Sequence, residues 1–106
     1  MTKSRQQPER EIQLAILKYM KARGWTCGKI KTTGARRGKA FLFDPYQFRG
    51  IADLLAFTPY GLCFIEVKAG KNQLSPDQIR FEELCKLSGT CYIVARSLDD
   101  IIKIFP

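Results

Sequence analysis

Two carboxylates set into apolar runs constrain this chain more than any other feature of its sequence. Asp53 and Glu66 each lie in a short run of apolar residues, and Lys68 follows two positions after Glu66. A buried carboxylate must be paired, neutralised or bound to a metal, because removing its charge from water is costly. Both runs have the composition of strands, and alternation puts Phe64, Glu66 and Lys68 on one face of the second. The sequence therefore predicts a polar site within a sheet.

The short connection between these two strands, residues 58–61, decides where the three charges lie. A two-residue turn in the middle of the connection would set Asp53 directly across from Glu66. A turn one residue later would set Asp53 across from Lys68, with Glu66 as its diagonal neighbour. Both registers bring the charges onto one face, whereas an odd loop length or a bulge would separate them. Two carboxylates beside a cation suit a divalent metal site.

The composition indicates what kind of partner the protein binds. The 106 residues are enough for one domain with a core, and 18 Lys+Arg against 10 Asp+Glu give a net charge of +8. This balance favours a polyanionic partner, with nucleic acid first and an anionic membrane surface second. No apolar run reaches bilayer length and no signal-peptide core is present, so we expect a soluble, cytoplasmic protein that binds no membrane.

Histidine is absent from the sequence, which excludes zincin motifs, Ser-His-Asp triads and nucleases that use a catalytic histidine. Any hydrolytic chemistry must then come from carboxylates, lysine and a bound ion. The four cysteines form no CxxC pair and lie in apolar segments: Cys27, Cys63, Cys85 and Cys91. That placement favours buried free thiols over a zinc site or a disulfide framework.

The remaining pattern predicts the element order αβββαβα, an α/β fold with a mixed sheet flanked by helices. Residues 1–8 are expected to form a basic flexible arm, and residues 9–106 a single domain. Helices are predicted at 8–23, 76–88 and 98–105, and strands at 25–33, around Asp53, around Glu66 and at 90–96. Ser75 is predicted to cap the second helix, with Gln78 completing a capping box.

A basic, glycine-rich segment at residues 34–39 follows the first predicted strand. Such a cluster is most often a solvated surface, but beside a metal site it could hold phosphates. The candidate nucleic-acid-binding residues are Lys31, Arg36, Arg37, Lys39, Arg49 and Lys71. The neighbouring aromatic residues are expected to pack in the core rather than stack on bases: Phe41, Phe43, Tyr46 and Phe48.

The strand acids supply hard oxygen ligands, which suit Mg²⁺ or Mn²⁺, and the backbone carbonyl of Val67 is a candidate third ligand. A cation held there can bind a phosphate oxygen and activate a water. Lys68 would orient or help deprotonate that water, or balance the charge on the phosphate. Gly50 would leave space for a close backbone approach. In the alternative reading, Glu66 and Lys68 lie on an exposed strand face and Asp53 is a turn acid.

Four motifs in this order resemble the virus-type replication-repair nuclease (VRR-NUC) domain of the PD-(D/E)XK superfamily: EIQ at 11–13, RGIAD at 49–53, IEVK at 65–68 and LSPDQ at 74–78. The resemblance spans about residues 9–104 and implies a restriction-endonuclease-like αβββαβ core. It also implies metal-dependent phosphodiester hydrolysis, with Asp53 and Glu66 as metal ligands and Lys68 catalytic. Two further residues gain active-site roles from it: Glu11, also a candidate metal ligand, and Gln78. Ala52 departs from the broader motif, which has proline there.

The resemblance also implies a substrate and an assembly. Small stand-alone members resemble phage-encoded proteins that act as dimers on branched DNA, including four-way (Holliday) junctions. We therefore expect an Mg²⁺- or Mn²⁺-dependent, homodimeric DNA endonuclease, selective for branched DNA and working inside a bacterial host. The alternatives are a non-selective or restriction-like duplex nuclease and a non-catalytic, basic nucleic-acid-binding module whose acids are structural.

Overall fold

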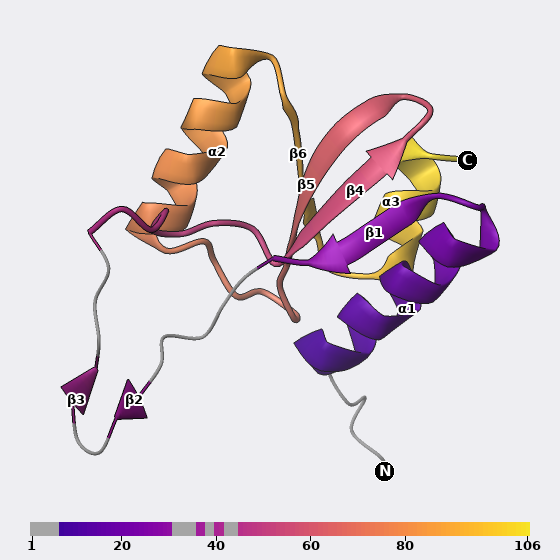
Figure 1. The fold of residues 1–106 in the computed structure, drawn as a ribbon. Coiled ribbons are helices and arrows are strands. Elements are labelled where there is room, and N and C mark those ends of the chain that lie inside the picture. The colour runs from indigo at the N-terminus through magenta and orange to yellow at the C-terminus, as the bar shows by residue number, and fades with distance from the viewer. Residues whose placement is uncertain (1–6, 31–35, 38–39, 42–44) are drawn as a thin grey trace, which may run out of the picture.

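The protein forms a four-stranded mixed sheet with helices packed on both faces (Figure 1). The computed structural model describes residues 7–30, 36–37, 40–41 and 45–106. Its elements are α1 (Glu9–Ala22), β1 (Thr26–Lys29), β2 (Arg36–Arg37), β3 (Ala40–Phe41), β4 (Leu54–Thr58), β5 (Gly61–Val67), α2 (Pro76–Ser88), β6 (Cys91–Ala95) and α3 (Leu98–Ile104). The predicted fold class, an α/β fold with a mixed sheet flanked by helices, is confirmed.

The strands of the main sheet run in the order β1-β4-β5-β6. β4 is antiparallel to both β1 and β5, and β6 is parallel to β5 because α2 carries the chain across between them. A separate two-stranded ladder joins β2 to β3, in a region where the sequence predicted only a loop. No helix in the described part of the chain is long and apolar enough to cross a membrane.

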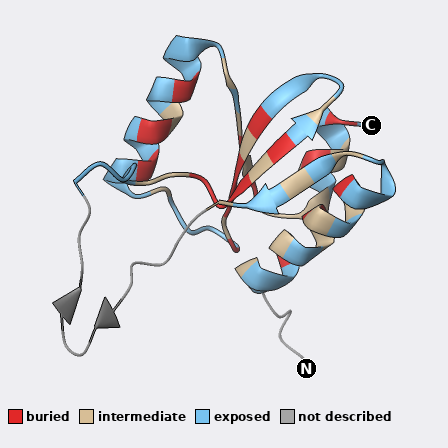
Figure 2. Ribbon diagram, in the orientation of Figure 1, coloured by how far each residue is buried: buried red, intermediate tan, exposed pale blue. Residues whose placement is uncertain are grey.

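Helices α1 and α3 cover one face of the sheet. Ile12, Ile16 and Met20, spaced along one side of α1, are buried against Ile65 and Val67 of β5. The opposite face is partly covered by α2, whose buried residues Phe81 and Cys85 form a smaller cluster with Ala52. Figure 2 shows that much of α2 and of the sheet on that side stays exposed.

Local signals fix α2 as the sequence predicted. The Ser75 side chain accepts a hydrogen bond from the Gln78 backbone, while the Gln78 side chain accepts one from the Ser75 backbone, which closes the capping box. Pro76 begins the helix, and Gly89 ends it in the left-handed conformation. Local chemistry therefore helps to set the position of Gln78.

The β4–β5 hairpin has the first of the two registers left open by the sequence. Thr58 pairs with Gly61 across a two-residue turn, and Leu54 pairs with Ile65. Continuing this register by one residue brings Asp53 to the position opposite Glu66. One detail differs from the prediction, because Asp53 lies directly before β4 rather than inside a strand.

Several side-chain predictions near the basic segment are not met. Tyr46 and Phe48, expected in the core, are 94% and 64% exposed. The side chains of Phe41 and Phe43 lie outside the described residues, as do those of Lys31, Arg36, Arg37 and Lys39. Cys91, expected to be buried, is exposed. It begins β6, which has a neighbour on one side only in the main sheet, so less of the strand is covered.

Gly50 holds the segment before Asp53 against the start of α2. Its φ is +70°, and a Cβ there would lie 2.3 Å from the carbonyl carbon and oxygen of Asp77 and 2.5 Å from the Gln78 nitrogen. Both the backbone conformation and the lack of space therefore require glycine. The close approach expected at this position is present.

We predict that Gly50→Ala lowers the free energy of unfolding by about 2 to 4 kcal/mol, since the new methyl group must push the start of α2 away. Urea denaturation followed by circular dichroism measures the loss. Gly28→Ala is the matched control, because a Cβ at Gly28 meets nothing within 4 Å. Equal losses in the two variants would contradict the close-contact explanation.

Candidate active site

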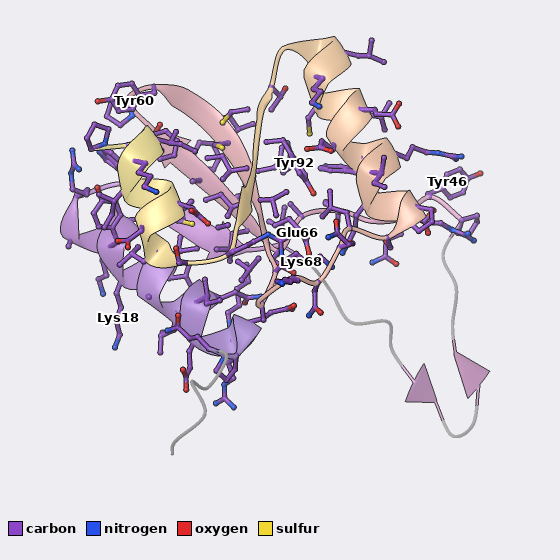
Figure 3. All side chains as sticks on the ribbon, turned by 180° about the vertical axis from the view of Figure 1, so that it is seen from behind. Lys18, Tyr46, Tyr60, Glu66, Lys68 and Tyr92 are labelled. Carbon is purple, nitrogen blue, oxygen red and sulfur yellow. The ribbon has the colours of Figure 1, made fainter. Side chains whose placement is uncertain are left out.

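Asp53 and Glu66 are both buried where β4 begins and β5 ends. Their exposed fractions are 7% and 1%, which rules out the alternative reading of an exposed strand face. Glu66 shares its face of β5 with Phe64 rather than with the apolar residues that contact α1, as alternation predicted. In Figure 3, Glu66 and Lys68 lie together near the start of α2.

The Asp53 carboxylate binds the backbone at the end of the neighbouring strand. Its Oδ2 accepts a hydrogen bond of 2.8 Å from the Val67 backbone N–H. The hydrogen bond is buried and joins the residue before β4 to the last residue of β5. It holds the backbone of Val67, the residue between Glu66 and Lys68, next to an ionisable oxygen.

The Glu66 carboxylate contacts the polar side chains of Gln78 and Lys68. Gln78 Nε2 donates a hydrogen bond of 3.1 Å to Glu66 Oε2, and Lys68 Nζ lies 3.9 Å from the same oxygen. Gln78 thus uses its amide oxygen to cap α2 and its amide nitrogen to bind the acid. The sequence predicted both Gln78 roles separately, one from the capping pattern and one from the family resemblance.

A second helix contacts the turn that follows Lys68. Glu9 Oε2, from the first turn of α1, accepts a hydrogen bond of 3.2 Å from the Ala69 backbone N–H. Arg96 Nη1 donates one of 2.7 Å to the Gly70 carbonyl. Neither residue was a candidate from the sequence, where the family resemblance pointed to Glu11 instead.

Glu11, the first-helix acid that the resemblance pointed to, is exposed. It lines a shallow depression at the start of α1 with Pro8, Arg10 and Leu14. Across the described residues, no three acid, cysteine or histidine side chains gather closely enough to hold a metal ion. Glu11 therefore does not join Asp53 and Glu66 as a third carboxylate in this structure.

Tyr92 on β6 adds a buried hydroxyl, and Figure 3 labels both Tyr92 and Glu66. Within the described residues, this hydroxyl makes no hydrogen bond. Burial raises the pKa of Tyr92 well above its ordinary value, and the negative charge of Glu66 raises it further. The hydroxyl accordingly keeps its proton at neutral pH. The sequence offered no signal for it beyond its place in a buried strand.

The donor set fits a small divalent cation. Asp53 and Glu66 supply hard carboxylate oxygens from adjacent strands, and the Val67 carbonyl lies in the chain between Glu66 and Lys68. Mg²⁺ in particular is usually bound through one or two carboxylates, with waters and substrate phosphates completing its shell. A third acidic side chain is therefore not required for these residues to hold one.

The candidate nucleic-acid contacts are described only in part. Arg49 and Lys71 are exposed. Arg49 precedes Gly50, which touches the start of α2, and Lys71 lies within the turn after Lys68. Both are therefore near the acids in the chain and open to solvent. A DNA-binding role for each of the six cations stays a prediction.

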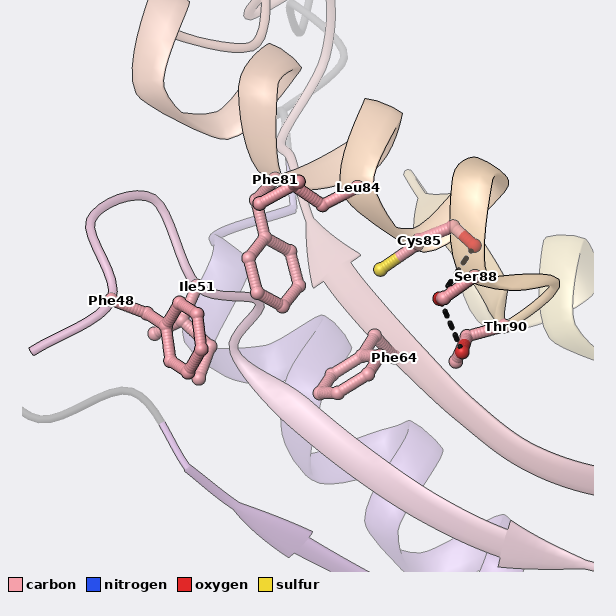
Figure 4. A pocket seen from close by; sticks show the side chains of 8 residues that line it. All are labelled: Phe48, Ile51, Phe64, Phe81, Leu84, Cys85, Ser88 and Thr90. Carbon is pink, nitrogen blue, oxygen red and sulfur yellow. Dashed lines mark hydrogen bonds between the residues drawn. The ribbon is translucent and has the colours of Figure 1, made fainter.

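An apolar groove of about 380 Å³ lies on the same side of the sheet, between α2 and the chain around Ile51 (Figure 4). Its floor is aromatic, with ring centroids 5.1 Å apart for Phe64 and Phe81 and 6.0 Å apart for Phe48 and Phe81. The lining residues are Phe48, Ile51, Phe64, Phe81, Leu84, Cys85, Ser88 and Thr90.

Two solved structures resemble this chain over nearly its whole length. One, described as "VRR_NUC domain", is 25% identical, covers 92% of each chain and has a TM-score of 0.67. The other, described as "VRR_NUC domain protein", is 19% identical, covers 95% of this chain and 87% of its own, and has a TM-score of 0.62. No protein-family model and no curated protein matches the sequence. The chain has the fold of VRR_NUC domain proteins.

We predict that Gln78→Glu lowers the free energy of unfolding by roughly 2 to 4 kcal/mol at neutral pH, because it removes the donor to Glu66 and sets two carboxylates together. When the two neighbouring carboxylates of this variant share a proton, one of them can again donate a hydrogen bond to the other. As the pH falls, the folded variant therefore binds more protons than its unfolded chain does. Its stability relative to wild type should then rise as the pH falls. Urea denaturation at acidic and neutral pH measures both.

The matched control for this variant is Ser75→Ala, which removes only the cap and should cost about 1 kcal/mol at either pH. A loss in Gln78→Glu that does not change with pH would show that the contact between Gln78 and Glu66 is unimportant.

Proposed function

We propose that this protein is a metal-dependent DNA endonuclease, and that residues 9–106 form a single VRR-NUC-type domain. The observation that carries the proposal is the pair of buried carboxylates, Asp53 and Glu66, beside Lys68 in the fold of VRR_NUC domain proteins. Those structures imply a PD-(D/E)XK-type nuclease. The net charge of +8 supports a nucleic-acid substrate.

Asp53, Glu66 and the Val67 carbonyl would hold Mg²⁺ or Mn²⁺. When bound, such a cation supplies Lewis-acid charge to a phosphate oxygen and makes a water more acidic. The Val67 N–H fixes the Asp53 carboxylate, and Gln78 Nε2 fixes that of Glu66, so both ligands are oriented by hydrogen bonds of their own. A positive ion would also offset the cost of burying two carboxylates.

Lys68 would act on the reacting phosphate. Its ammonium group lies 3.9 Å from Glu66 Oε2. It would orient the attacking water or balance the charge that develops on the phosphate. Glu9 supports this role by binding the backbone of Ala69, directly after Lys68. A catalytic part for Glu11 remains a prediction from the family resemblance.

Arg49 and Lys71 are proposed to bind the DNA backbone, together with Lys31, Arg36, Arg37 and Lys39. Cation contacts to phosphates release counterions, so binding should weaken steeply as salt rises. The preference for branched DNA rests on the family resemblance alone, as does the expectation that the protein works inside a bacterial cell.

We predict that the wild type cleaves DNA in Mg²⁺ or Mn²⁺ but not in EDTA, and that Asp53→Asn and Glu66→Gln each lose about 100-fold or more in rate. Even residues that only support metal ligands contribute about 10- to 100-fold. The measurement uses an end-labelled four-way junction and a linear duplex of matched sequence. Glu83→Gln, an exposed acid on α2, is the control and should retain full activity.

The outcomes separate the three functions considered. If the protein cuts the junction symmetrically in the presence of metal and leaves the linear duplex intact, it is a junction-selective nuclease. Equal cutting of both substrates supports the chemistry and removes the selectivity. Salt-sensitive binding without cleavage in any metal, retained in Asp53→Asn and Glu66→Gln, would instead identify a nucleic-acid-binding module.

The homodimer is also part of the proposal. Two of the large apolar side chains that line the groove of Figure 4 are exposed, Phe48 at 64% and Leu84 at 48%. Exposed apolar patches of this kind commonly mark association surfaces. A second copy packed there would give two sites in one particle, as symmetric cutting of two strands requires.

We predict that the wild type sediments as a dimer and that Leu84→Glu weakens dimerisation by at least about tenfold, because a charge would be buried at the interface. Sedimentation velocity over a concentration series measures both. Leu14→Glu is the control: Leu14 is similarly exposed, at 52%, but lies on α1, across the sheet. A monomeric wild type would contradict the dimer, and equal weakening by both variants would contradict this surface.

A further inference from the structure

Two cysteines face each other across neighbouring strands. Cys63 on β5 and Cys91 on β6 are direct partners in the parallel ladder, so their side chains lie on the same face of the sheet. The two Sγ atoms are 2.6 Å apart. Neither residue belongs to the proposed nuclease site, although Glu66 is three positions further along β5.

The backbone at this position already suits a covalent link. Neighbouring strands lie about 4.7–4.9 Å apart, which falls within the Cα separation of about 4.4–6.8 Å that a disulfide spans. Bonding requires the sulfur atoms to move from 2.6 Å to about 2.05 Å. The spacing of the two strands is therefore compatible with a disulfide at this position.

The two thiols also differ in exposure to solvent, and this difference sets the order in which they react with an oxidant. Cys91 is exposed, whereas Cys63 is 1% exposed. Burial raises the pKa of the Cys63 thiol, and the neighbouring Cys91 raises it further. An external oxidant therefore meets Cys91 first, and Cys63 is placed to react second.

The other cysteines are less well placed. Cys85 packs with Ala52 and Phe81 on the α2 face, whereas Cys63 belongs to the core on the opposite face. Cys27 pairs with Ala56 on β4, and Ala56 in turn pairs with Cys63, so a whole strand separates the two thiols. Cys63 and Cys91 form the one directly adjacent cysteine pair in the described ladders.

We propose that Cys63 and Cys91 form a reversible disulfide between β5 and β6 in the folded protein. With a small disulfide such as oxidised glutathione, the Cys91 thiolate attacks one sulfur after losing its proton to solvent. One glutathione thiolate leaves and is protonated. The Cys63 thiol then loses its proton and attacks Cys91 Sγ, and the second glutathione leaves as a thiolate and takes up a proton. Two protein thiols are oxidised and one glutathione disulfide is reduced to two thiols.

The bond would enclose most of the candidate active site in one covalent loop. Residues 63–91 contain Glu66, Lys68 and Gln78, leaving Asp53 outside. The link would join β5 to β6 upstream of Glu66 and constrain how far these strands separate. The proposal concerns the thiols alone and holds whether or not the protein is a nuclease.

The test equilibrates the folded wild type with reduced and oxidised glutathione over a range of ratios, followed by acid quenching and alkylation. Intact mass is expected to show the number of alkylated thiols falling from four to two in a single step, without retained glutathione. Peptide mapping should link Cys63 to Cys91. In denaturant, where the ladder is absent, this preference should disappear.

Cys91→Ser is expected to abolish the bond, and Cys27→Ser, the matched control, to leave it intact. Cys91 is exposed, so its replacement should preserve the fold, which circular dichroism checks. Three outcomes would overturn the proposal. All four thiols could stay reactive in excess oxidised glutathione, a glutathione could stay attached to Cys91, or the bridge could form to Cys85. Mapping of the wild type decides the matter even if a variant fails to fold.

Discussion

The burial of two carboxylates is the constraint on which the rest of this structure depends. Asp53 and Glu66 are almost fully removed from water, so each needs partners that the fold must supply. Asp53 takes its hydrogen bond from the backbone at the end of β5, and Glu66 takes one from Gln78 on α2. The β4–β5 register and the docking of α2 are therefore coupled through two acids. Shifting either element would leave a buried charge without its donor, which is far more costly than losing an apolar contact.

Gln78 is the side chain that couples the start of α2 to the buried acid Glu66. One amide caps α2 through its oxygen and binds Glu66 through its nitrogen, so the helix start and the acid share a single side chain. Gly50 makes this possible, since only glycine lets the segment before Asp53 approach the backbone of Asp77 and Gln78 so closely. The motif residues around 50–53 and 74–78 thus meet in space for a packing reason as well as for chemistry.

Local signals predicted much of this arrangement. The turn at 58–61 narrowed the register to two choices, and the capping pattern placed Gln78. Features that depend on contacts between distant parts of the chain were not predicted from the sequence. Glu9 and Glu11 are two positions apart on one helix, and their order alone cannot say which one turns toward Ala69. Tyr46 and Phe48 lie in the turn and loop before Gly50 rather than in a strand, and their aromatic composition alone did not reveal this. The contact between Cys63 and Cys91 required knowing that β6 lies beside β5.

The cost of the buried acids bears on function more strongly than the basic charge does. A surface rich in lysine and arginine is enough to bind nucleic acid, and carboxylates beneath it would weaken both that binding and the fold. A binding module gains nothing from Asp53 and Glu66, and apolar residues of similar size would pack in their place. A nuclease would gain from them, because acids that are costly to bury by themselves would serve as fixed ligands for a cation. Their orientation by Val67 and Gln78, set before any substrate arrives, is what such chemistry requires.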